Sequence, residues 1–336
     1  MTTGLRSAPR PAAAAVLGLG THRPARVVSN AEVCEHIDST DEWIRERSGI
    51  ATRRYGGPED SVVEMGAAAA AKALAAAGVD ASQVDLVLVT TCSYPNELPS
   101  ASSLVGHKLG VPLGAGAIDL NAACAGFCYG LSVAADAVRA GSARYVLVVG
   151  SERLTDMIDL TDRSMAFIFG DGAGAALVGP SDVEGIGPVA WATDSAAAPL
   201  ITQRASWVEH RDNPTEYEAP YFQMDGPAVF RWTVTKLAPI AKQACEAAGI
   251  SLDELKAFVP HQANLRIVEG VAKALRLPES VVLARDVIDN GNTSSASIPL
   301  ALERLVERGE VVSGDPALLI GFGAGLTVAA QVVLVP

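Results

Sequence analysis

Apolar runs alternate with helix-forming stretches along most of the chain. The segments "VDLVLVTT" (84–91), "AGAIDL" (115–120) and "RYVLVVG" (144–150) have the length and the β-branched content of buried strands. The alanine-rich stretches between such runs favour helices. This alternation predicts an α/β fold built in layers.

Local signals mark several helix ends. Ser39 to Glu42 ("STDE") and Ser61 to Glu64 ("SVVE") both fit the spacing of a capping box at a helix N-terminus. Gly78 follows "AKALAAA", where a residue of left-handed conformation is expected at the end of a helix.

A long internal repeat organises the chain. The segment "AAAGVDASQVDLVLV" (75–89) resembles "EAAGISLDELKAFVP" (246–260), with Gly78 over Gly249, an offset of 249 − 78 = 171 residues. The same offset places 118–124 over 288–295 with one residue of slip, and 145–150 near 317–323. Solenoid repeats are far shorter, so this spacing indicates a duplicated half. We expect halves at 1–185 and 186–336, packed as one body because no flexible linker separates them.

Composition narrows the class of protein. With 336 residues and 49% hydrophobic content, the chain can bury a large core. Its first twenty residues show no secretion-signal pattern and no window of about 18 apolar residues follows, so a cytoplasmic location without a membrane span is expected.

The net charge and the cysteines argue against several kinds of partner and site. A net charge of −12 argues against nucleic acid or an anionic membrane as the main partner. The five cysteines are odd in number and do not have the spacing of a zinc site, so we expect free thiols and no metal.

Cys124 lies at a chemically favourable junction. If 115–120 is a strand and 124–141 a helix, the thiol lies at a helix N-terminus, where the macrodipole and free N–H groups favour a thiolate. A nucleophile fits this position. A small apolar thiol that only fills space is the alternative, and for Cys128, one turn further on, it is the better explanation.

His261 and Asn292 lie at two other junctions. His261 follows the short apolar run "AFVP" and takes the repeat position of Thr90, at the C-terminal end of a strand, where open α/β sheets bind ligands. Asn292 belongs to the turn "DNGNTSSAS" (289–297), whose Ser and Thr residues can cap the following helix. Taken alone, His261 can be a histidine with only a structural role, and Asn292 can be only a turn residue.

The repeat brings these residues together. A pseudo-two-fold arrangement would place Cys124, His261 and Asn292 at one central site. Thioester chemistry needs such a set, because a nucleophile takes the acyl group and neutral donors stabilise an enolate. The glycine-rich segments 169–179 and 321–327 lack nucleotide-binding spacing, although N–H groups of the second can form an oxyanion hole.

With these motifs in view, the sequence resembles the β-ketoacyl-acyl carrier protein synthase III family, the initiating ketosynthases of fatty acid synthesis. The resemblance covers nearly the whole chain and rests on "STDEWIRERSGIATRR", "AACAGF", "FIFGDGAGA", "VPHQANLRI", "GNTSSASIPLA" and "GFGAGL". It implies a thiolase-like duplicated αβαβα sandwich that forms a homodimer.

The resemblance also implies a decarboxylative condensation that needs no cofactor. Cys124 would take the starter from acyl-CoA as a thioester, and malonyl-acyl carrier protein would then bind. His261 and Asn292 would hold the malonyl thioester carbonyl so that loss of CO2 gives an enolate that attacks the acyl group. The N–H groups of Cys124 and Ala324 would form the oxyanion hole for acylation.

Further residues are assigned by the resemblance. The residues implied for CoA are an adenine-sandwiching pair, Trp43 and Arg163, a phosphate contact, Arg47, and two residues of the pantetheine tunnel, Gly226 and Asn264. Stacking and cation–π attraction give a physical reason for the pair, although Trp43 could instead be a hydrophobic staple beside its capping box.

A carrier-protein site is implied near the His261 helix. Its residues would be Arg231, Gln262, Arg266 and Lys273, and the basic ones form a local patch that can outweigh a remote net charge within a Debye length of about 8 Å. An ordinary solvated helix face is the alternative. Leu98, in a segment that shapes the acyl pocket across the dimer interface, stands where some relatives carry an aromatic residue, which leaves the starter open.

Two rival functions remain at this stage. One is a starter-priming synthase or acyltransferase of the same fold in a specialised polyketide-type pathway. The presence of Asn292 favours condensation over this alternative. The other is an inactive partner subunit, and the presence of Cys124 argues against it.

Overall fold

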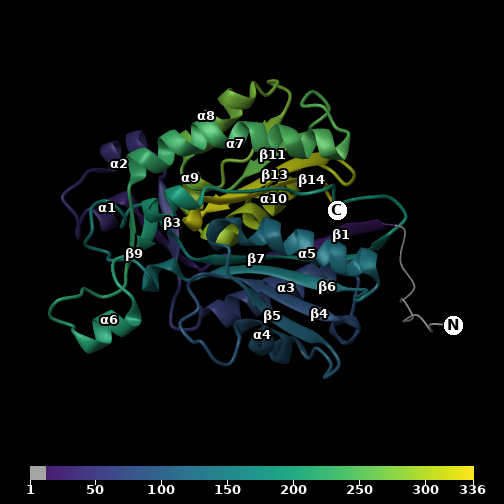
Figure 1. The fold of residues 1–336 in the computed structure, drawn as a ribbon, viewed down its shortest axis with the longest axis horizontal. Coiled ribbons are helices and arrows are strands. Elements are labelled where there is room, and N and C mark those ends of the chain that lie inside the picture. The colour runs from purple at the N-terminus through teal and green to yellow at the C-terminus, as the bar shows by residue number, and fades with distance from the viewer. Residues whose placement is uncertain (1–12) are drawn as a thin grey trace.

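The structure of the chain is a computed structural model that describes residues 13–336 (Figure 1). Residues 1–12 lie outside the described residues. They include the start of the expected first half and much of the N-terminal segment in which no secretion signal was expected. No helix within 13–336 is long and apolar enough to cross a membrane.

The first sheet has five strands in the order β1-β7-β6-β4-β5. β4 runs parallel to both β5 and β6, and β7 pairs antiparallel with β6 and β1. Its strands are β1 (Ala13–His22), β4 (Leu86–Thr90), β5 (Gly116–Leu120), β6 (Val146–Glu152) and β7 (Gly172–Ser181). The three strands predicted from apolar runs are confirmed, each within two residues.

The second sheet repeats this arrangement in the order β12-β11-β13-β14-β8. β11 is parallel to β12 and β13, while β14 is antiparallel to β13 and β8, so each strand has a counterpart of the same direction in the first sheet. Its strands are β8 (Ala190–Thr193), β11 (Ala257–Pro260), β12 (Val282–Leu283), β13 (Pro316–Gly323) and β14 (Thr327–Leu334). The duplication predicted from the repeat is confirmed.

Three helical layers enclose the two sheets (Figure 1). The outer face of the first sheet packs against α3 (Val62–Ala77) and α4 (Ala101–Leu109). The outer face of the second packs against α7 (Gly226–Ala248) and α8 (Leu265–Leu275). Between the sheets lie α5 (Gly126–Ala140) and α10 (Ser297–Glu307). The αβαβα sandwich expected from the sequence is confirmed.

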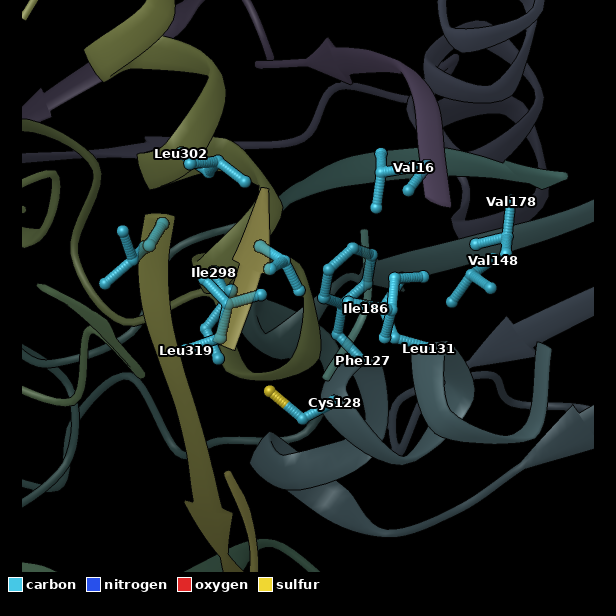
Figure 2. Packing of buried hydrophobic residues seen from close by; sticks show 14 of the residues in the cluster. Val16, Phe127, Cys128, Leu131, Val148, Val178, Ile186, Ile298, Leu302 and Leu319 are labelled. Atoms are coloured by element: carbon cyan, nitrogen blue, oxygen red, sulfur yellow. The ribbon is translucent and has the colours of Figure 1, made fainter. Parts of the chain in front are cut away.

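The central layer forms the main core (Figure 2). Phe127 and Leu131 of α5 meet Ile298 and Leu302 of α10 between the sheets, and all four are at most 1% exposed. Burial of side chains this large stabilises the fold by about 1.5–3 kcal/mol each. Cys128 lies in the same cluster, as expected for a space-filling thiol.

Shorter elements connect the strands and helices of the sandwich. They are β2 (Arg26–Ser29), α1 (Asn30–Val33), α2 (Asp41–Ser48), β3 (Thr52–Tyr55), β9 (Ile201–Gln203), α6 (Trp207–Asp212), β10 (Phe222–Met224), α9 (Val287–Asn290) and the 3-10 turns η1 (Ala81–Gln83), η2 (Ala123–Ala125), η3 (Leu154–Asp156), η4 (Ser195–Leu200), η5 (Ser294–Ala296) and η6 (Ala324–Leu326).

The predicted helix ends need two corrections. Ser61 caps α3 and Gly78 ends it with a φ of 64°, as predicted. Thr40, not Ser39, caps α2, because its hydroxyl accepts the N–H of Trp43 at 3.1 Å. α10 has no side-chain cap, since a 3-10 turn leads directly into it from the Asn292 turn.

Candidate active site

A cavity of about 810 Å³ is lined by segments from both halves of the chain. Cys124, His261, Asn292 and Ala324 all line it, although they lie as far as 200 residues apart in sequence. The repeat predicted this convergence.

Cys124 lies in η2, between the end of β5 and the start of α5. Ala123 before it has a left-handed φ of 46°, and the Asn121 side chain accepts the Ala123 N–H at 3.1 Å. α5 begins at Gly126, so the prediction that the helix starts at 124 was wrong by two residues. The thiol therefore projects from a strained turn that leads into the helix.

The Asn292 turn has the same geometry in the second half. Ser294 has a φ of 47°, and the Asn292 Oδ1 accepts the Ser294 N–H at 2.8 Å. Asn292 thus corresponds to Asn121, and Ser295 to Cys124, each with the offset of 171 residues found in the repeat. The residue of slip expected at this junction was wrong, because the two turns match residue for residue.

Strand β13 passes close behind the Cys124 turn. A Cβ on Gly323 would lie 2.7 Å from the Cys124 backbone nitrogen, and a Cβ on Gly321 would lie 2.8 Å from the Ala125 Cα. Because ordinary van der Waals contacts are 3.4–4 Å, glycine is the residue that fits at both positions. The sequence "GFGAG" thus allows β13 to approach the thiol.

Burial dominates the protonation of Cys124. Desolvation raises the pKa of its thiol to about 12, a hydrogen bond with Ser294 lowers it in part, and the charge of Glu152 raises it further. The thiolate expected from the helix N-terminus is therefore outweighed by burial in this state. A pKa this high favours the neutral thiol, although the Cys124 side chain is partly exposed at the cavity wall.

His261 is held as a neutral imidazole. Burial lowers its pKa to about 3. The Ser297 hydroxyl accepts the Gln262 N–H at 3.3 Å and lies 2.8 Å from His261 Nδ1, to which it can donate its proton. A neutral ring that accepts at Nδ1 carries its proton on Nε2. His261 can then offer an N–H donor to a ligand.

Asn292 is fixed in orientation by its own turn. Its Oδ1 accepts from Ser294, which assigns the oxygen to the turn and leaves the amide nitrogen as a donor for a ligand. Its backbone N–H donates to Ile168 O at 2.9 Å and its carbonyl accepts from Gly170 N at 3.0 Å. Histidine and asparagine together supply two neutral donors.

Four of the five residues implied for CoA line the cavity. Trp43, Arg47, Gly226 and Asn264 line it. Arg163 does not, but its guanidinium lies 4.6 Å from the Trp43 ring centroid. This cation–π pair can hold a flat ring system between its members only if they separate. Trp43 also packs edge-on against Phe167, at 5.3 Å between ring centroids.

The expected carrier-protein residues divide into two groups. Arg231 and Arg266 are exposed and line the cavity, and Lys273 is exposed on the same helix as Arg266. Gln262 is a correction, because it is 1% exposed and its amide bonds the Pro260 carbonyl and the Val287 N–H. Its side chain is held inside the fold and cannot contact a carrier protein at the surface.

Leu98 does not line the cavity of its own chain and is 87% exposed.

Sequence reasoning missed four residues of the site: Cys92, Glu152, Ser297 and Gly323. Cys92 and Gly323 line the cavity, Ser297 orients His261, and Glu152 is a buried carboxylate behind the Asn292 turn. Only Gly323 and Ser297 had a local signal, in the motifs that contain them.

In the described part of the chain, no group of three or more His, Cys, Asp or Glu side chains could hold a metal ion.

Two family models match this chain. One is described as 3-Oxoacyl-[acyl-carrier-protein (ACP)] synthase III and matches residues 118–195, and the other, described as the C terminal of that synthase, matches residues 245–335.

Individual proteins are similar over almost the full length. A Beta-ketoacyl-[acyl-carrier-protein] synthase III of Streptomyces lividans is 53% identical over 96% of this chain and 94% of the relative. The solved structure of the Priming beta-Ketosynthase from the R1128 Polyketide Biosynthetic Pathway has a TM-score of 0.96 and 52% identity, covering 99% of both chains. That of the 3-oxoacyl-(acyl carrier protein) synthase III of Pseudomonas aeruginosa PAO1 has a TM-score of 0.88 and 34% identity, covering 96% of this chain and 98% of that one.

Proposed function

The chain belongs to the 3-oxoacyl-[acyl-carrier-protein] synthase III family, and from this premise we propose that it condenses an acyl-CoA starter with malonyl-acyl carrier protein. The products are a β-ketoacyl-acyl carrier protein, CO2 and CoA, and the reaction initiates fatty acid synthesis. The observation that carries the proposal is the meeting of Cys124, His261 and Asn292 in one cavity.

In the first half-reaction, Cys124 takes the acyl group. Its sulfur attacks the thioester carbonyl, the C–S bond to CoA breaks, and the CoA sulfur leaves with the proton of the thiol. The backbone N–H groups of Cys124 and Ala324 serve as the oxyanion hole, which the close approach of Gly323 to the Cys124 nitrogen supports.

In the second half-reaction, His261 and Asn292 act on the malonyl thioester. Their N–H groups donate to its carbonyl oxygen, which becomes the enolate oxygen as the bond to the carboxylate breaks and CO2 leaves. The enolate carbon attacks the acyl carbonyl and expels the Cys124 sulfur, which takes up a proton from the solvent. A neutral imidazole suits this role, because it donates without transferring its proton.

We further propose how the substrates bind. The Trp43–Arg163 pair takes the adenine ring, Arg47 a CoA phosphate, and Gly226 and Asn264 border the pantetheine tunnel. Arg231, Arg266 and Lys273 form the carrier-protein surface. Arg231 and Arg266 are exposed cations that line the cavity, and Lys273 is a third on the same helix as Arg266; together they give an acidic partner a local field opposite to the net charge of −12.

The proposal extends to the assembly and location of the protein. We propose a homodimer through β5, since the outer side of this edge strand has no paired strand among residues 13–336 and the strand carries the exposed Ile118. Leu98, on the exposed segment before α4, then shapes the partner's acyl pocket. Each chain consists of halves 1–185 and 186–336, works without a cofactor and is cytoplasmic.

The half-reactions give a direct test. Purified protein and Cys124→Ala are incubated with acetyl-, isobutyryl- and longer acyl-CoAs, and the intact mass is measured before and after addition of malonyl-acyl carrier protein. We expect a gain of one acyl group that requires Cys124 and disappears as β-ketoacyl-carrier product. Absence of acylation by every acyl-CoA would refute the proposal.

A second candidate differs only in pathway. The similarity to a priming ketosynthase of a polyketide pathway, at 52% identity, favours the same condensation as the first step of a polyketide-type pathway. The two candidates differ in the starter acyl group that the enzyme prefers. The mass measurement compares the acyl-CoAs and shows which acyl group is loaded fastest.

A further inference from the structure

Glu152 is a buried carboxylate with no assigned role. It ends β6, is 0% exposed, and receives donors at both oxygens. Oε2 accepts the hydroxyls of Ser93 at 2.6 Å and Thr91 at 3.1 Å and the Cys92 N–H at 3.1 Å. Oε1 accepts the Cys92 thiol at 3.5 Å and the Cys92 N–H at 3.3 Å.

The same carboxylate reaches across to the second half of the chain. Oε1 also accepts the Ser295 hydroxyl at 2.8 Å and the Ser295 N–H at 3.4 Å. The Ser295 hydroxyl lies 2.7 Å from the Thr90 carbonyl as well. Since Ser295 takes the position in its half that Cys124 takes in the other, Glu152 holds the turn opposite the nucleophile.

This contact bears on the orientation of Asn292. Ser294, between Ser295 and Asn292, has the strained φ of 47° and donates the N–H that fixes the Asn292 amide. Its hydroxyl lies 3.6 Å from the Cys92 thiol, which Glu152 also contacts. Glu152 therefore holds Ser294 from both sides, through Ser295 and through Cys92.

We propose that Glu152 is a positioning residue for the decarboxylation step, which sets the Asn292 turn against the malonyl thioester. The proposal rests on the proposed function. The hydrogen bonds of Glu152 reach residues 91–93 and Ser295, so its loss disturbs the Asn292 turn directly. Its link to the acylation step is its charge, which raises the pKa of the Cys124 thiol. The carboxylate is suited to this task because every group around it is a donor.

Glu152→Gln tests the carboxylate at constant volume. Glutamine offers one acceptor and one donor group, and the site provides two backbone N–H groups that cannot reverse, those of Cys92 and Ser295. In either orientation the amide nitrogen faces a backbone N–H. With the oxygen at the Oε2 position, the Ser295 N–H loses its acceptor and the turn must shift. With the oxygen at the Oε1 position, both N–H groups keep an acceptor, but the amide nitrogen lies against the Cys92 N–H and the hydroxyls of Ser93 and Thr91 must reverse to accept from it.

The experiment measures the two half-reactions separately in the full-length protein. Acylation is followed by intact mass with acetyl-CoA, and decarboxylation by CO2 release from malonyl-acyl carrier protein. We expect Glu152→Gln to slow decarboxylation by at least about tenfold. Acylation should not be slowed, because loss of the Glu152 charge removes a contribution that raises the pKa of the Cys124 thiol, and the KM for the carrier protein should stay near the wild-type value.

Two variants accompany it. Ser295→Ala removes the contacts of the hydroxyl with Glu152 and with the Thr90 carbonyl but keeps the contact of the Ser295 N–H with Glu152, and it should slow decarboxylation by a smaller factor. The double variant should lose less than the product of the two single factors. Asp85→Asn is the control, because this carboxylate accepts the N–H groups of Arg144 and Tyr145 beyond the opposite end of β4. It should leave the ratio of the two half-reactions unchanged.

The outcomes separate the two proposals. Wild-type protein that performs neither half-reaction overturns the proposed function, and this inference with it. An active wild type, with Glu152→Gln normal or slowed equally in both half-reactions, overturns the inference alone. If Glu152→Gln does not fold, Ser295→Ala decides: selective loss of decarboxylation supports the positioning role, and equal or absent effects reject it.

Discussion

Gly323→Ala tests whether the approach of β13 fixes the nucleophile. Gly323 has a φ of −172°, an extended conformation open to any residue, so the substitution adds no backbone strain. It adds a single methyl group, directed at the Cys124 turn. Any effect on the thiol then arises from contact rather than from a change in backbone preference.

The magnitude follows from the distances. The new Cβ would lie 2.7 Å from the Cys124 nitrogen and 3.0 Å from its Cβ, against an ordinary contact of 3.4–4 Å. Gly323 is held by its pairing with Thr327 of β14 and the Cys124 turn is backbone, so neither yields easily. Overpacking of this kind costs about 1–3 kcal/mol of stability. A displacement of about half an ångström in a reacting group should slow acylation by about tenfold or more.

The assay combines stability and rate. Urea unfolding gives the change in stability, and intact mass against time gives the rate of Cys124 acylation by acetyl-CoA. Gly114→Ala is the matched control, since a Cβ there meets nothing within 4 Å. Acylation by Gly323→Ala at the wild-type rate would refute the argument that close approach positions the thiol.

Three further predictions follow from the same contacts. Because burial lowers the pKa of His261 to about 3, the unfolded chain binds the proton first as pH falls below about 6.5. Stability should therefore fall by about 2 kcal/mol between pH 7 and 5 through this group, a loss that His261→Asn should lack in urea unfolding at the two pH values. Arg163→Ala should raise the KM for acyl-CoA about three- to tenfold with kcat nearly unchanged in steady-state kinetics, through loss of its contact with Trp43. Thr40→Ala should lower the free energy of unfolding by about 1 kcal/mol in urea titrations, whereas Ser39→Ala should leave it nearly unchanged, because Thr40 caps the helix.

Short sequence patterns predicted the strands and helix ends well where a single segment carries the information. Strand positions followed from apolar runs, and the end of α3 from Gly78, because burial and left-handed backbone each require a recognisable residue type. The errors occurred where neighbours compete. Ser39 and Thr40 are both capable caps, and only the path of the chain decides that Thr40 points its hydroxyl at the Trp43 N–H.

The sequence by itself determined the duplicated fold, and with it the three junctions where Cys124, His261 and Asn292 lie. A repeat is visible in sequence because each half must satisfy the same packing. The tertiary structure alone decided the chemistry between the halves: the burial that sets the pKa of Cys124 and His261, the closeness of Gly323, and the contact of Glu152 with Ser295. These depend on groups that are distant in sequence, whose distance and exposure are fixed only when the sheets pack together.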